Sequence, residues 1–461
     1  MPTFADLPLT PALLEAISGQ GFTEPTPIQA ECIPVLVEGR DLVGQSQTGS
    51  GKTLAYGLPL LNGLNRDLRN RSLQGLVLCP TRELATQVCS ELRKVGRGLP
   101  GLRILEVCGG HSGWSQRQAL AQGVHVVVGT PGRVLDLIQR EGMNPEAIRR
   151  VVLDEADRML DLGFLPQVEQ ILERLPSERQ TAMFSATFPA AIQAISDRWQ
   201  SDPVSVAIAG EALTIDAVGH VAEKEDRLSA LLAVLSERIG SVPDGQAIVF
   251  GNFKETVKDV AAALASAGWS VGELHGDLEQ MDRDRVMARL RNHSVRVLVA
   301  TDVAARGIDL VGLDLVVHYE IPSKPEAWVH RSGRTGRAGE AGKVVALVSQ
   351  RELSRLAWIA DSLGITIPAE PLPIGTVAPT SAAMRTLYVG GGRKDKLRPG
   401  DILGALTGEG GLAGADIGTI EIHDRFSYVA VASAVFDQAF AALQNGRIKG
   451  RRFRVEVVAG G

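Results

Sequence analysis

The chain has 461 residues, of which 44% are hydrophobic and 22% charged, and its formal net charge is −5 at pH 7. Such a length exceeds one ordinary hydrophobic core, so we expect about two to four globular domains, and the composition excludes an intrinsically disordered protein. No apolar run reaches the ~18 residues of a membrane span, the N-terminus shows no secretory signal, and the four cysteines form no CxxC pair, so we expect a cytoplasmic protein with buried thiols.

The first motif follows an apolar segment and precedes a helical pattern. It reads Ser46, Gln47, Thr48, Gly49, Ser50, Gly51, Lys52 and Thr53. Gly49 and Gly51 permit a tight turn whose N–H groups point at phosphate oxygens, and Lys52 can reach the β- and γ-phosphates. The Thr53 hydroxyl can ligate Mg²⁺. The eight residues predict a phosphate-binding loop for ATP; the alternative is an ordinary glycine-rich turn.

Short apolar runs then alternate with helical patterns, which is typical of buried parallel strands in βαβ units. The predicted strands of this first series are residues 76–79, 124–128, 151–153 and 182–184. Ligands of such sheets bind beyond the carboxyl ends of the strands. We therefore expect the functional residues at that edge.

Asp154 and Glu155 open the segment Asp-Glu-Ala-Asp directly after a predicted strand. A carboxylate in this position can hold Mg²⁺, partly through water, and a second one can activate the attacking water. We assign the metal to Asp154 and the general base to Glu155. The alternative is an acidic helix start, since Asp and Glu favour helix N-termini.

The pattern weakens over residues 201–225, where residues 209–213 suggest a connector. A second α/β series follows, with strands predicted at residues 247–250, 295–300, 315–317 and 344–348. Residues 365–383 hold four prolines and many small residues, which is typical of a linker.

The tail from Met384 onward alternates strand, helix, strand, strand, helix, strand. This βαββαβ order is that of RNA-recognition modules. It carries 11 Lys and Arg against 8 Asp and Glu, whereas the rest of the chain has 37 against 45. A basic tail on an acidic body indicates a nucleic-acid contact there.

The motifs together resemble those of the DEAD-box ATP-dependent RNA helicases of superfamily 2, in the same order over most of the chain. This resemblance implies an α/β fold of two tandem RecA-like parallel-sheet domains plus a C-terminal α+β, RRM-like domain. We place the domains at residues 1–208, 209–366 and 384–461, with a linker at 367–383.

The resemblance also assigns residues in the first domain. Phe22 and Gln29 belong to a segment that reads adenine, and Gln29 can both donate to and accept from its edge. Ser185 and Thr187 belong to the motif that couples hydrolysis to strand separation. The implied contacts to the RNA backbone are Thr81, Arg82, Gly110, Thr130 and Arg133, whose charges and hydroxyls suit phosphate.

In the second domain the resemblance implies RNA contacts at His275, Gly276 and Thr301, and a ribose contact at Asp309. The segment from His330 to Arg337 resembles the arginine-finger motif. Arg334 and Arg337 would stabilise charge on the transferring phosphoryl group. Because the two domains supply different halves of this set, we expect closure over ATP and RNA to assemble the catalytic site.

The tail as a whole resembles that of a bacterial branch of the same family. This resemblance implies binding of a hairpin of 23S ribosomal RNA and of pre-50S particles, with no DNA or membrane partner, by a monomer. The candidate contacts are Lys394, Lys396, Arg398, Arg447, Lys449, Arg451 and Arg452. Phe426 and Tyr428 share one sheet face and could stack bases; alternatively one or both belong to the core.

The predicted function is an RNA-dependent ATPase that unwinds short duplexes during large-subunit assembly. Two alternatives stay open: a general RNA remodeller in mRNA turnover or cold response, and an ATP-gated RNA clamp without useful unwinding.

Overall fold

The structure is a computed structural model. It describes residues 3–46, 50–65, 72–109, 113–140, 142–208, 215–242, 244–305, 312–336, 342–373, 375, 379 and 381–458. Three separate sheets organise these residues, one of seven strands, one of six and one of four.

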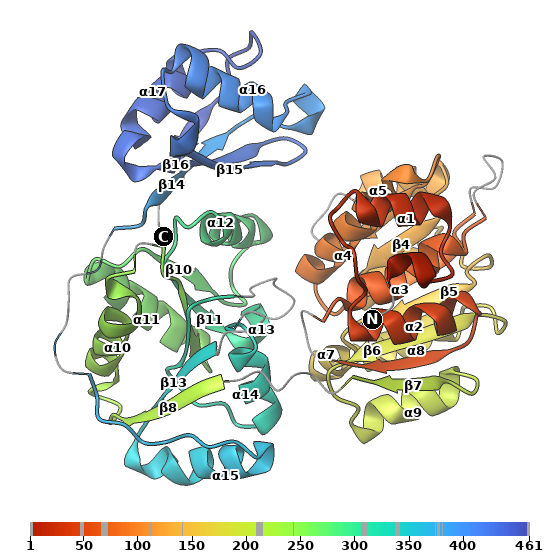
Figure 1. Cartoon of the computed structure of the whole chain (residues 1–461), viewed down its shortest axis with the longest axis horizontal. Helices are drawn as coiled ribbons and strands as arrows, with labels where there is room; N and C mark the ends of the chain where they lie inside the picture. The colour runs from red at the N-terminus through yellow and green to blue at the C-terminus, as the bar shows by residue number, and fades with distance from the viewer. Residues whose placement is uncertain are drawn as a thin grey trace. The chain divides into compact units, whose positions relative to one another are not determined.

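The first domain is built on a parallel sheet in the order β3-β4-β2-β5-β6-β1-β7. Its strands are β1 Leu42–Gln45, β2 Gly75–Leu78, β3 Ile104–Val107, β4 Val126–Gly129, β5 Arg150–Leu153, β6 Gln180–Ser185 and β7 Val204–Ala207. Its helices are α1 Pro11–Ser18, α2 Pro27–Val37, α3 Lys52–Asn62, α4 Arg82–Val95, α5 Gly113–Ala121, α6 Pro131–Arg140, α7 Ala156–Asp161, α8 Leu165–Leu172 and α9 Ala190–Trp199 (Figure 1). Two apolar clusters bury the central strands, which is why β2 and β4 are apolar at every position.

The second domain repeats this design with a parallel sheet in the order β10-β11-β9-β12-β13-β8. Its strands are β8 Ile215–Val221, β9 Ala247–Gly251, β10 Val271–Leu274, β11 Val297–Thr301, β12 Leu315–His318 and β13 Gly342–Val348. Its helices are α10 Arg227–Leu235, α11 Lys254–Ser266, α12 Gln280–Arg291, α13 Asp302–Ala305, α14 Pro325–Ser332 and α15 Leu353–Leu363.

The predicted central strands of both domains are confirmed to within two residues. The weak pattern over residues 201–225 nevertheless contains two strands, β7 at the edge of the first sheet and β8 at the edge of the second. An edge strand is covered less completely and needs fewer apolar residues. The proposed connector, residues 209–213, lies outside the described residues.

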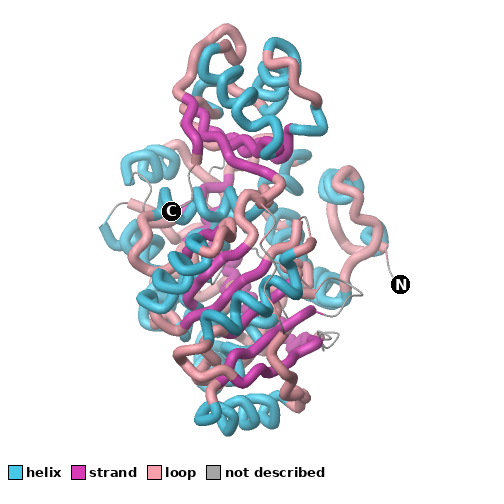
Figure 2. Tube along the Cα trace, turned by 90° about the vertical axis from the view of Figure 1, so that its left-hand side faces the viewer, coloured by secondary structure: helices cyan, strands magenta, loops and turns pink. Residues whose placement is uncertain are grey.

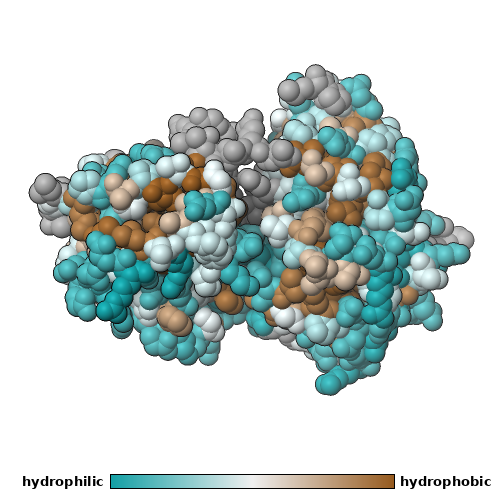
Figure 3. All heavy atoms as spheres, turned by 90° about the horizontal axis from the view of Figure 1, so that it is seen from below, coloured by the Kyte–Doolittle hydropathy of each residue, from teal (hydrophilic) through white to brown (hydrophobic). Residues whose placement is uncertain are grey.

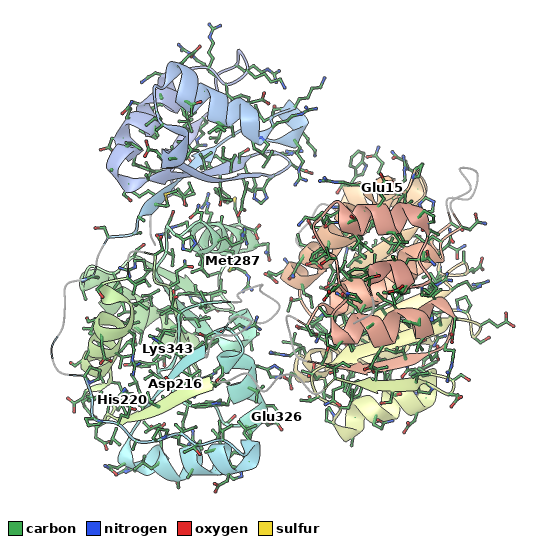
Figure 4. All side chains as sticks on the ribbon, in the orientation of Figure 1. Glu15, Asp216, His220, Met287, Glu326 and Lys343 are labelled. Atoms are coloured by element: carbon green, nitrogen blue, oxygen red, sulfur yellow. The ribbon has the colours of Figure 1, made fainter. Side chains whose placement is uncertain are left out.

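The start of the predicted linker is tied to the second sheet. The backbone N–H of Gly219 in β8 donates to the Pro368 carbonyl at 2.8 Å, and that of Glu370 donates back to Gly219 at 2.9 Å. His220 adds a contact between Nδ1 and the Glu370 carbonyl at 3.0 Å. On its other side β8 pairs with β13, where Asp216 lies opposite Lys343 (Figure 4).

The C-terminal domain has an antiparallel sheet in the order β15-β16-β14-β17. Its elements are β14 Met384–Val389, α16 Pro399–Gly404, β15 Ile417–Ile422, β16 Ser427–Ala432, α17 Phe436–Asn445 and β17 Val455–Val457. The predicted βαββαβ order is confirmed. Both helices lie on one face of the sheet, over an apolar core that includes Leu387, Val429 and Phe436 (Figure 2).

On the face of the protein shown in Figure 3, patches of hydrophobic residues are bordered by hydrophilic ones. Within the described residues, no helix is both long enough and apolar enough to span a membrane.

Candidate nucleotide-binding and RNA-binding sites

The predicted phosphate-binding loop joins β1 to α3. Lys52 opens α3 and is only 8% exposed, and its Nζ donates to the Ser46 carbonyl at 3.0 Å. The hydroxyls of Ser46 and Ser50 are 2.8 Å apart. Gly51 caps the helix with a φ of 91°, which a residue with a Cβ rarely adopts. The lysine is thus held inside the loop beside the N-terminus of a helix, where an anion is favoured. Gln47, Thr48 and Gly49 lie outside the described residues.

Gln29, the predicted adenine reader, also braces this loop. It is 4% exposed, and its Nε2 donates to the Gly51 carbonyl at 3.0 Å. Its Oε1 accepts from the Thr26 N–H at 3.0 Å, and the Thr26 hydroxyl donates to the Ser50 carbonyl at 2.8 Å. Thr26 and Gln29 form a capping box at the start of α2, and the Thr-x-x-Gln pattern before a helix is the sequence signature of this motif. Phe22, by contrast, is 47% exposed and free to contact a planar ligand.

Asp154 follows β5 and is 3% exposed. The Tyr56 hydroxyl donates to its Oδ2 at 2.7 Å, and the Glu155 N–H donates to its Oδ1 at 3.0 Å. Burial raises the pKa of Asp154 to about 6, although Lys52 and these donors act in the opposite direction. The sequence alone did not assign a role to Tyr56. Tyr56 lies one helical turn after Lys52, on the same face of α3, and this spacing is the sequence feature that could have indicated its role.

Asp154 and Thr53 offer a carboxylate and a hydroxyl oxygen, the hard donors that Mg²⁺ prefers. The residues present therefore fit the predicted Mg²⁺. The carboxylate is buried and held by two hydrogen bonds, so its orientation is set before any ligand arrives. Glu155, the predicted base, adopts a left-handed backbone with φ 50°, which is uncommon for a residue with a side chain.

Ser185 and Thr187 join the end of β6 to the start of α7. The Ser185 hydroxyl accepts from the Asp157 N–H at 3.1 Å. Asp157 Oδ2 accepts from both the N–H and the hydroxyl of Thr187, each at 3.0 Å. The segment that carries Asp154 and the segment predicted to couple hydrolysis to unwinding are therefore one hydrogen-bonded unit.

The RNA contacts predicted in the first domain lie at the carboxyl ends of β2 and β4, where α4 and α6 begin. Thr81 caps α4 through its Oγ1, which accepts from the Leu84 N–H at 3.3 Å. A Cβ at Gly109 would lie 2.9 Å from Nη2 of Arg82, so a larger residue there would displace this guanidinium. Thr130 and Arg133 follow β4, and Arg133 Nε donates to Gln116 at 3.0 Å. Gly110 lies outside the described residues.

The second-domain candidates are mostly buried. His275 is 2% exposed and Thr301 9%, and the Thr301 hydroxyl accepts from the Ala304 N–H at 3.4 Å. Gly276 has no atom within 4 Å of where a Cβ would stand, so its backbone is open to a ligand. Arg334 follows α14 and is 7% exposed. Asp309 and Arg337 lie outside the described residues.

Arg331 has a structural role that the sequence alone did not reveal. It is 1% exposed, and its guanidinium donates to both Asp302 oxygens at 2.6 and 2.7 Å. It also donates to Asn252 Oδ1 and the Glu320 carbonyl, each at 2.7 Å. These partners follow β9, β11 and β12, so Arg331 ties three strand ends to the helix that precedes Arg334. Its position in the same arginine-rich segment as Arg334 is the sequence feature that could have indicated this role.

The basic residues predicted in the tail come from two segments that meet. Lys449 Nζ donates to the Lys396 carbonyl at 3.0 Å and lies 3.4 Å from Asp401. Arg451 lies 3.9 Å from Asp395. All of the candidate side chains are exposed: Lys394, Lys396, Arg398, Arg447, Lys449, Arg451 and Arg452. We call these seven residues the basic rim.

The aromatic residues of the tail form a cluster. The ring centroids of Tyr388 and Phe426 lie 5.6 Å apart, and those of Phe426 and Tyr428 5.2 Å apart. Tyr428 is 1% exposed, whereas Phe426 is partly exposed. For Tyr428 the structure therefore favours burial over an open base-stacking position.

Comparison with known families assigns all three domains. The DEAD/DEAH box helicase family matches residues 26–195, the helicase conserved C-terminal domain matches residues 223–339, and the DbpA RNA binding domain matches residues 386–457. The chain belongs to the DEAD/DEAH box helicases and is an ATP-dependent RNA helicase.

Its similarity to one kind of helicase extends over the whole chain. It is 44% identical to the ATP-dependent RNA helicase DbpA of Escherichia coli over 453 residues, which is 98% of each chain. It is 36% identical to DbpA of Bacillus subtilis over 99% of each chain. Among solved structures, Dbp5 of S. cerevisiae bound to RNA and ADP BeF3 matches 81% of this chain and 96% of that one, with 31% identity and a TM-score of 0.73.

Proposed function

We propose that the C-terminal domain binds a hairpin of 23S ribosomal RNA in pre-50S particles, and that the two helicase domains then separate short duplexes nearby. In this proposal the protein works in the cytoplasm as a monomer during assembly of the large ribosomal subunit. The observation that carries it is the basic rim, which lies in the part of the chain that matches the DbpA RNA binding domain. Seven exposed cations from two adjacent segments suit a folded RNA backbone.

The proposed ATP site uses residues of the first domain to bind and orient the nucleotide. Lys52 and the loop N–H groups hold the phosphates, and Gln29 contacts adenine while it keeps its hydrogen bond to the Gly51 carbonyl. Asp154 and Thr53 hold Mg²⁺, which when bound supplies charge neutralisation to the phosphates. Glu155 accepts the proton of the attacking water. Arg334 and Arg337 of the second domain stabilise the transferring phosphoryl group.

The proposed link from hydrolysis to strand separation is the unit of Asp157, Ser185 and Thr187. Asp157 accepts hydrogen bonds from both the N–H and the hydroxyl of Thr187. A shift of the segment after Asp154 therefore moves the end of β6 as well. The proposed contacts at Thr81, Arg82, Thr130 and Arg133 touch the RNA backbone, so the core would bind RNA of any sequence. Selectivity for a particular RNA then depends on the C-terminal domain.

The test compares ATP hydrolysis stimulated by two RNA fragments of equal length, one with the 23S hairpin and one with the hairpin scrambled. We expect the full chain to prefer the hairpin fragment, and deletion of residues 384–461 to abolish the preference while RNA-stimulated hydrolysis remains. The double variant Lys396→Glu/Lys449→Glu should reproduce the deletion. Lys224→Glu, an exposed lysine of the second domain, is the matched control. Equal stimulation of the full chain by both fragments would refute the targeting.

A strand-displacement assay separates this function from an ATP-gated clamp. With a short duplex joined to the hairpin, we expect strand release with ATP and none with a non-hydrolysable analogue. Tight binding without strand release under either condition would support the clamp.

A further inference from the structure

The side chain of Tyr56 connects the two residues that are proposed to hold Mg²⁺. Its hydroxyl donates to Oδ2 of Asp154 at 2.7 Å, and it also forms a side-chain hydrogen bond with Thr53, one helical turn earlier in α3. A tyrosine hydroxyl has one proton, and Asp154 accepts it. Thr53 is therefore the donor in its contact with Tyr56. The three side chains form one continuous series of hydrogen bonds, from Thr53 through Tyr56 to Asp154.

The direction of this series suits Thr53 as a metal ligand. A hydroxyl that binds a cation through a lone pair must direct its proton away from the cation. Because Tyr56 accepts the proton of Thr53, the lone pairs of Thr53 Oγ1 are left for a hard cation such as Mg²⁺. Thr53 is partly exposed, whereas Tyr56 and Asp154 are buried, so a ligand can reach this end of the series.

The Asp154 carboxylate is held at both of its oxygens. Oδ2 accepts from the Tyr56 hydroxyl, and Oδ1 accepts from the Glu155 N–H at 3.0 Å. A carboxylate has about four lone-pair sites, so each oxygen keeps one for a cation or for its water. Two bonds from different segments fix the plane of the carboxylate. A residue that orients a metal ligand without touching the metal typically changes metal affinity about 10- to 100-fold when it is lost.

The ring of Tyr56 is itself fixed by the core of the first domain. Tyr56 is 1% exposed, and its ring centroid lies 5.3 Å from that of Phe184, with 53° between the planes. Both rings belong to the same apolar cluster, and β6, which carries Phe184, lies between β5 and β1. A Cβ at Gly44 of β1 would come within 2.7 Å of the Phe184 ring, so glycine leaves the space that this ring fills. Close packing of this kind holds the Tyr56 hydroxyl in one position.

We propose that Tyr56 is a positioning residue of the ATP site, whose hydroxyl orients both Thr53 and Asp154 for Mg²⁺. This inference rests on the proposed function, because it takes Thr53 and Asp154 as the metal ligands. The phosphate-binding loop does not depend on the Tyr56 hydroxyl, since Lys52 is held by the Ser46 carbonyl. Tyr56 therefore controls the binding of the metal and not the binding of the metal-free nucleotide.

A purely structural role of the hydroxyl is the competing explanation. In that case Tyr56 would only satisfy the buried Asp154 carboxylate, and loss of the hydroxyl would lower the stability of the fold. Positioning also predicts a loss of stability, so a stability measurement does not separate the two roles. Only positioning predicts that metal affinity falls while the affinity for the metal-free nucleotide stays the same.

The direct test measures Mn²⁺ binding to the complex of the full chain with ADP, by electron paramagnetic resonance. Mn²⁺ prefers the same oxygen ligands as Mg²⁺. Tyr56→Phe keeps the ring and removes only the hydroxyl, and we expect it to raise the dissociation constant for Mn²⁺ about 10- to 100-fold. Binding of a fluorescent ADP analogue in excess EDTA should stay unchanged. Tyr319→Phe, the same change in the second domain, is the control. Unchanged or tighter Mn²⁺ binding in Tyr56→Phe would overturn the proposal.

A double-mutant cycle tests whether Tyr56 acts through the metal ligands. We expect Thr53→Val to weaken Mn²⁺ binding, and Tyr56→Phe to weaken it less in the Thr53→Val background than in the parent, because residues in one hydrogen-bond network are coupled. Fully additive losses would contradict positioning. If neither Thr53→Val nor Asp154→Asn weakens Mn²⁺ binding, the proposed metal site fails and the role of Tyr56 with it. If both weaken it and Tyr56→Phe does not, only the role of Tyr56 fails.

A Mg²⁺ titration of RNA-stimulated ATP hydrolysis gives a second readout. In Tyr56→Phe both metal ligands are present but are no longer held, so we expect the Mg²⁺ concentration for half-maximal rate to rise by the same factor as the dissociation constant for Mn²⁺. High Mg²⁺ should then restore most of the rate in Tyr56→Phe and none in Asp154→Asn. A rate in Tyr56→Phe that is low at every Mg²⁺ concentration would overturn the proposal.

Discussion

The hydroxyl of Tyr56 donates a hydrogen bond to Oδ2 of Asp154 over 2.7 Å, and both side chains are buried. The carboxylate proposed to hold Mg²⁺ is thus oriented by a residue of the helix that begins with Lys52. Burial raises the pKa of Asp154 from 3.8 to about 6, so at neutral pH its charge is retained against a desolvation penalty. The Asp154 carboxylate is therefore oriented to bind a cation, and its buried charge destabilises the folded protein when no cation is bound.

Asp154→Asn should therefore stabilise the Mg²⁺-free protein. The folded state binds this proton more tightly than the unfolded state, so the destabilisation is present above pH 6 and fades as the pH falls toward 4. We expect the free energy of unfolding to rise by about 1–3 kcal/mol at pH 7.5, and by much less at pH 4.5. Urea unfolding at both pH values measures this, and a loss of stability at pH 7.5 would contradict it. Hydrolysis of ATP should disappear in the same variant.

Gln29→Glu should weaken ATP binding by disturbing the phosphate-binding loop. The new carboxylate oxygen would face the Gly51 carbonyl, which accepts a hydrogen bond from Gln29 Nε2 in the native chain. An acceptor against an acceptor costs about 1–3 kcal/mol, so we expect the dissociation constant for ATP to rise about 10- to 100-fold. Titration with a fluorescent ATP analogue measures it, with Gln193→Glu on the exposed face of α9 as control. An unchanged constant would show that Gln29 does not brace the loop.

Thr187→Val should separate hydrolysis from unwinding. It keeps the shape of the side chain and the backbone N–H bond to Asp157 but removes the hydroxyl bond of 3.0 Å. We expect RNA-stimulated hydrolysis to stay within about fivefold, because one net hydrogen bond contributes only about 1 kcal/mol, while strand release falls further. Parallel measurement of both activities tests this. A proportional loss of the two would assign Thr187 to hydrolysis itself.

Arg334→Ala should slow hydrolysis and leave ATP binding largely intact. A group that stabilises charge only in the transition state contributes about 100- to 1,000-fold to the rate. Single-turnover hydrolysis and equilibrium binding, measured side by side, test this. Arg355→Ala, an exposed arginine of α15, should change neither. Equal losses of ATP binding and hydrolysis in Arg334→Ala would show that Arg334 does not act as an arginine finger.

Much of the fold could be predicted because central parallel strands are buried on both faces. Runs such as those in β2 and β4 are therefore apolar throughout, whereas β7 reads Val-Ser-Val-Ala, belongs to a sheet edge and was missed. The phosphate-binding loop and Asp154 could be proposed from the sequence because their chemistry is local in the chain.

The residues that hydrogen-bond to the candidate site residues lie far from them in the sequence, so no local motif indicated them. Tyr56 reaches Asp154 across 98 residues, and Arg331 reaches Asn252 across 79. The sequence likewise showed that Phe426 and Tyr428 share a face, but periodicity does not tell what covers a face. Here Arg291 of α12 donates a hydrogen bond to Glu421, the residue opposite Tyr428 in the sheet, across 130 residues of the chain.

The central claim is that RNA controls ATP turnover in this chain and that ATP turnover separates RNA strands. It is tested most directly by measuring ATP hydrolysis and release of a short RNA strand in one reaction, with and without RNA, in the full chain and in Lys52→Ala. We predict slow hydrolysis without RNA, strong stimulation with it, strand release only with ATP, and loss of both activities in Lys52→Ala. Hydrolysis at the same rate with and without RNA would contradict the account.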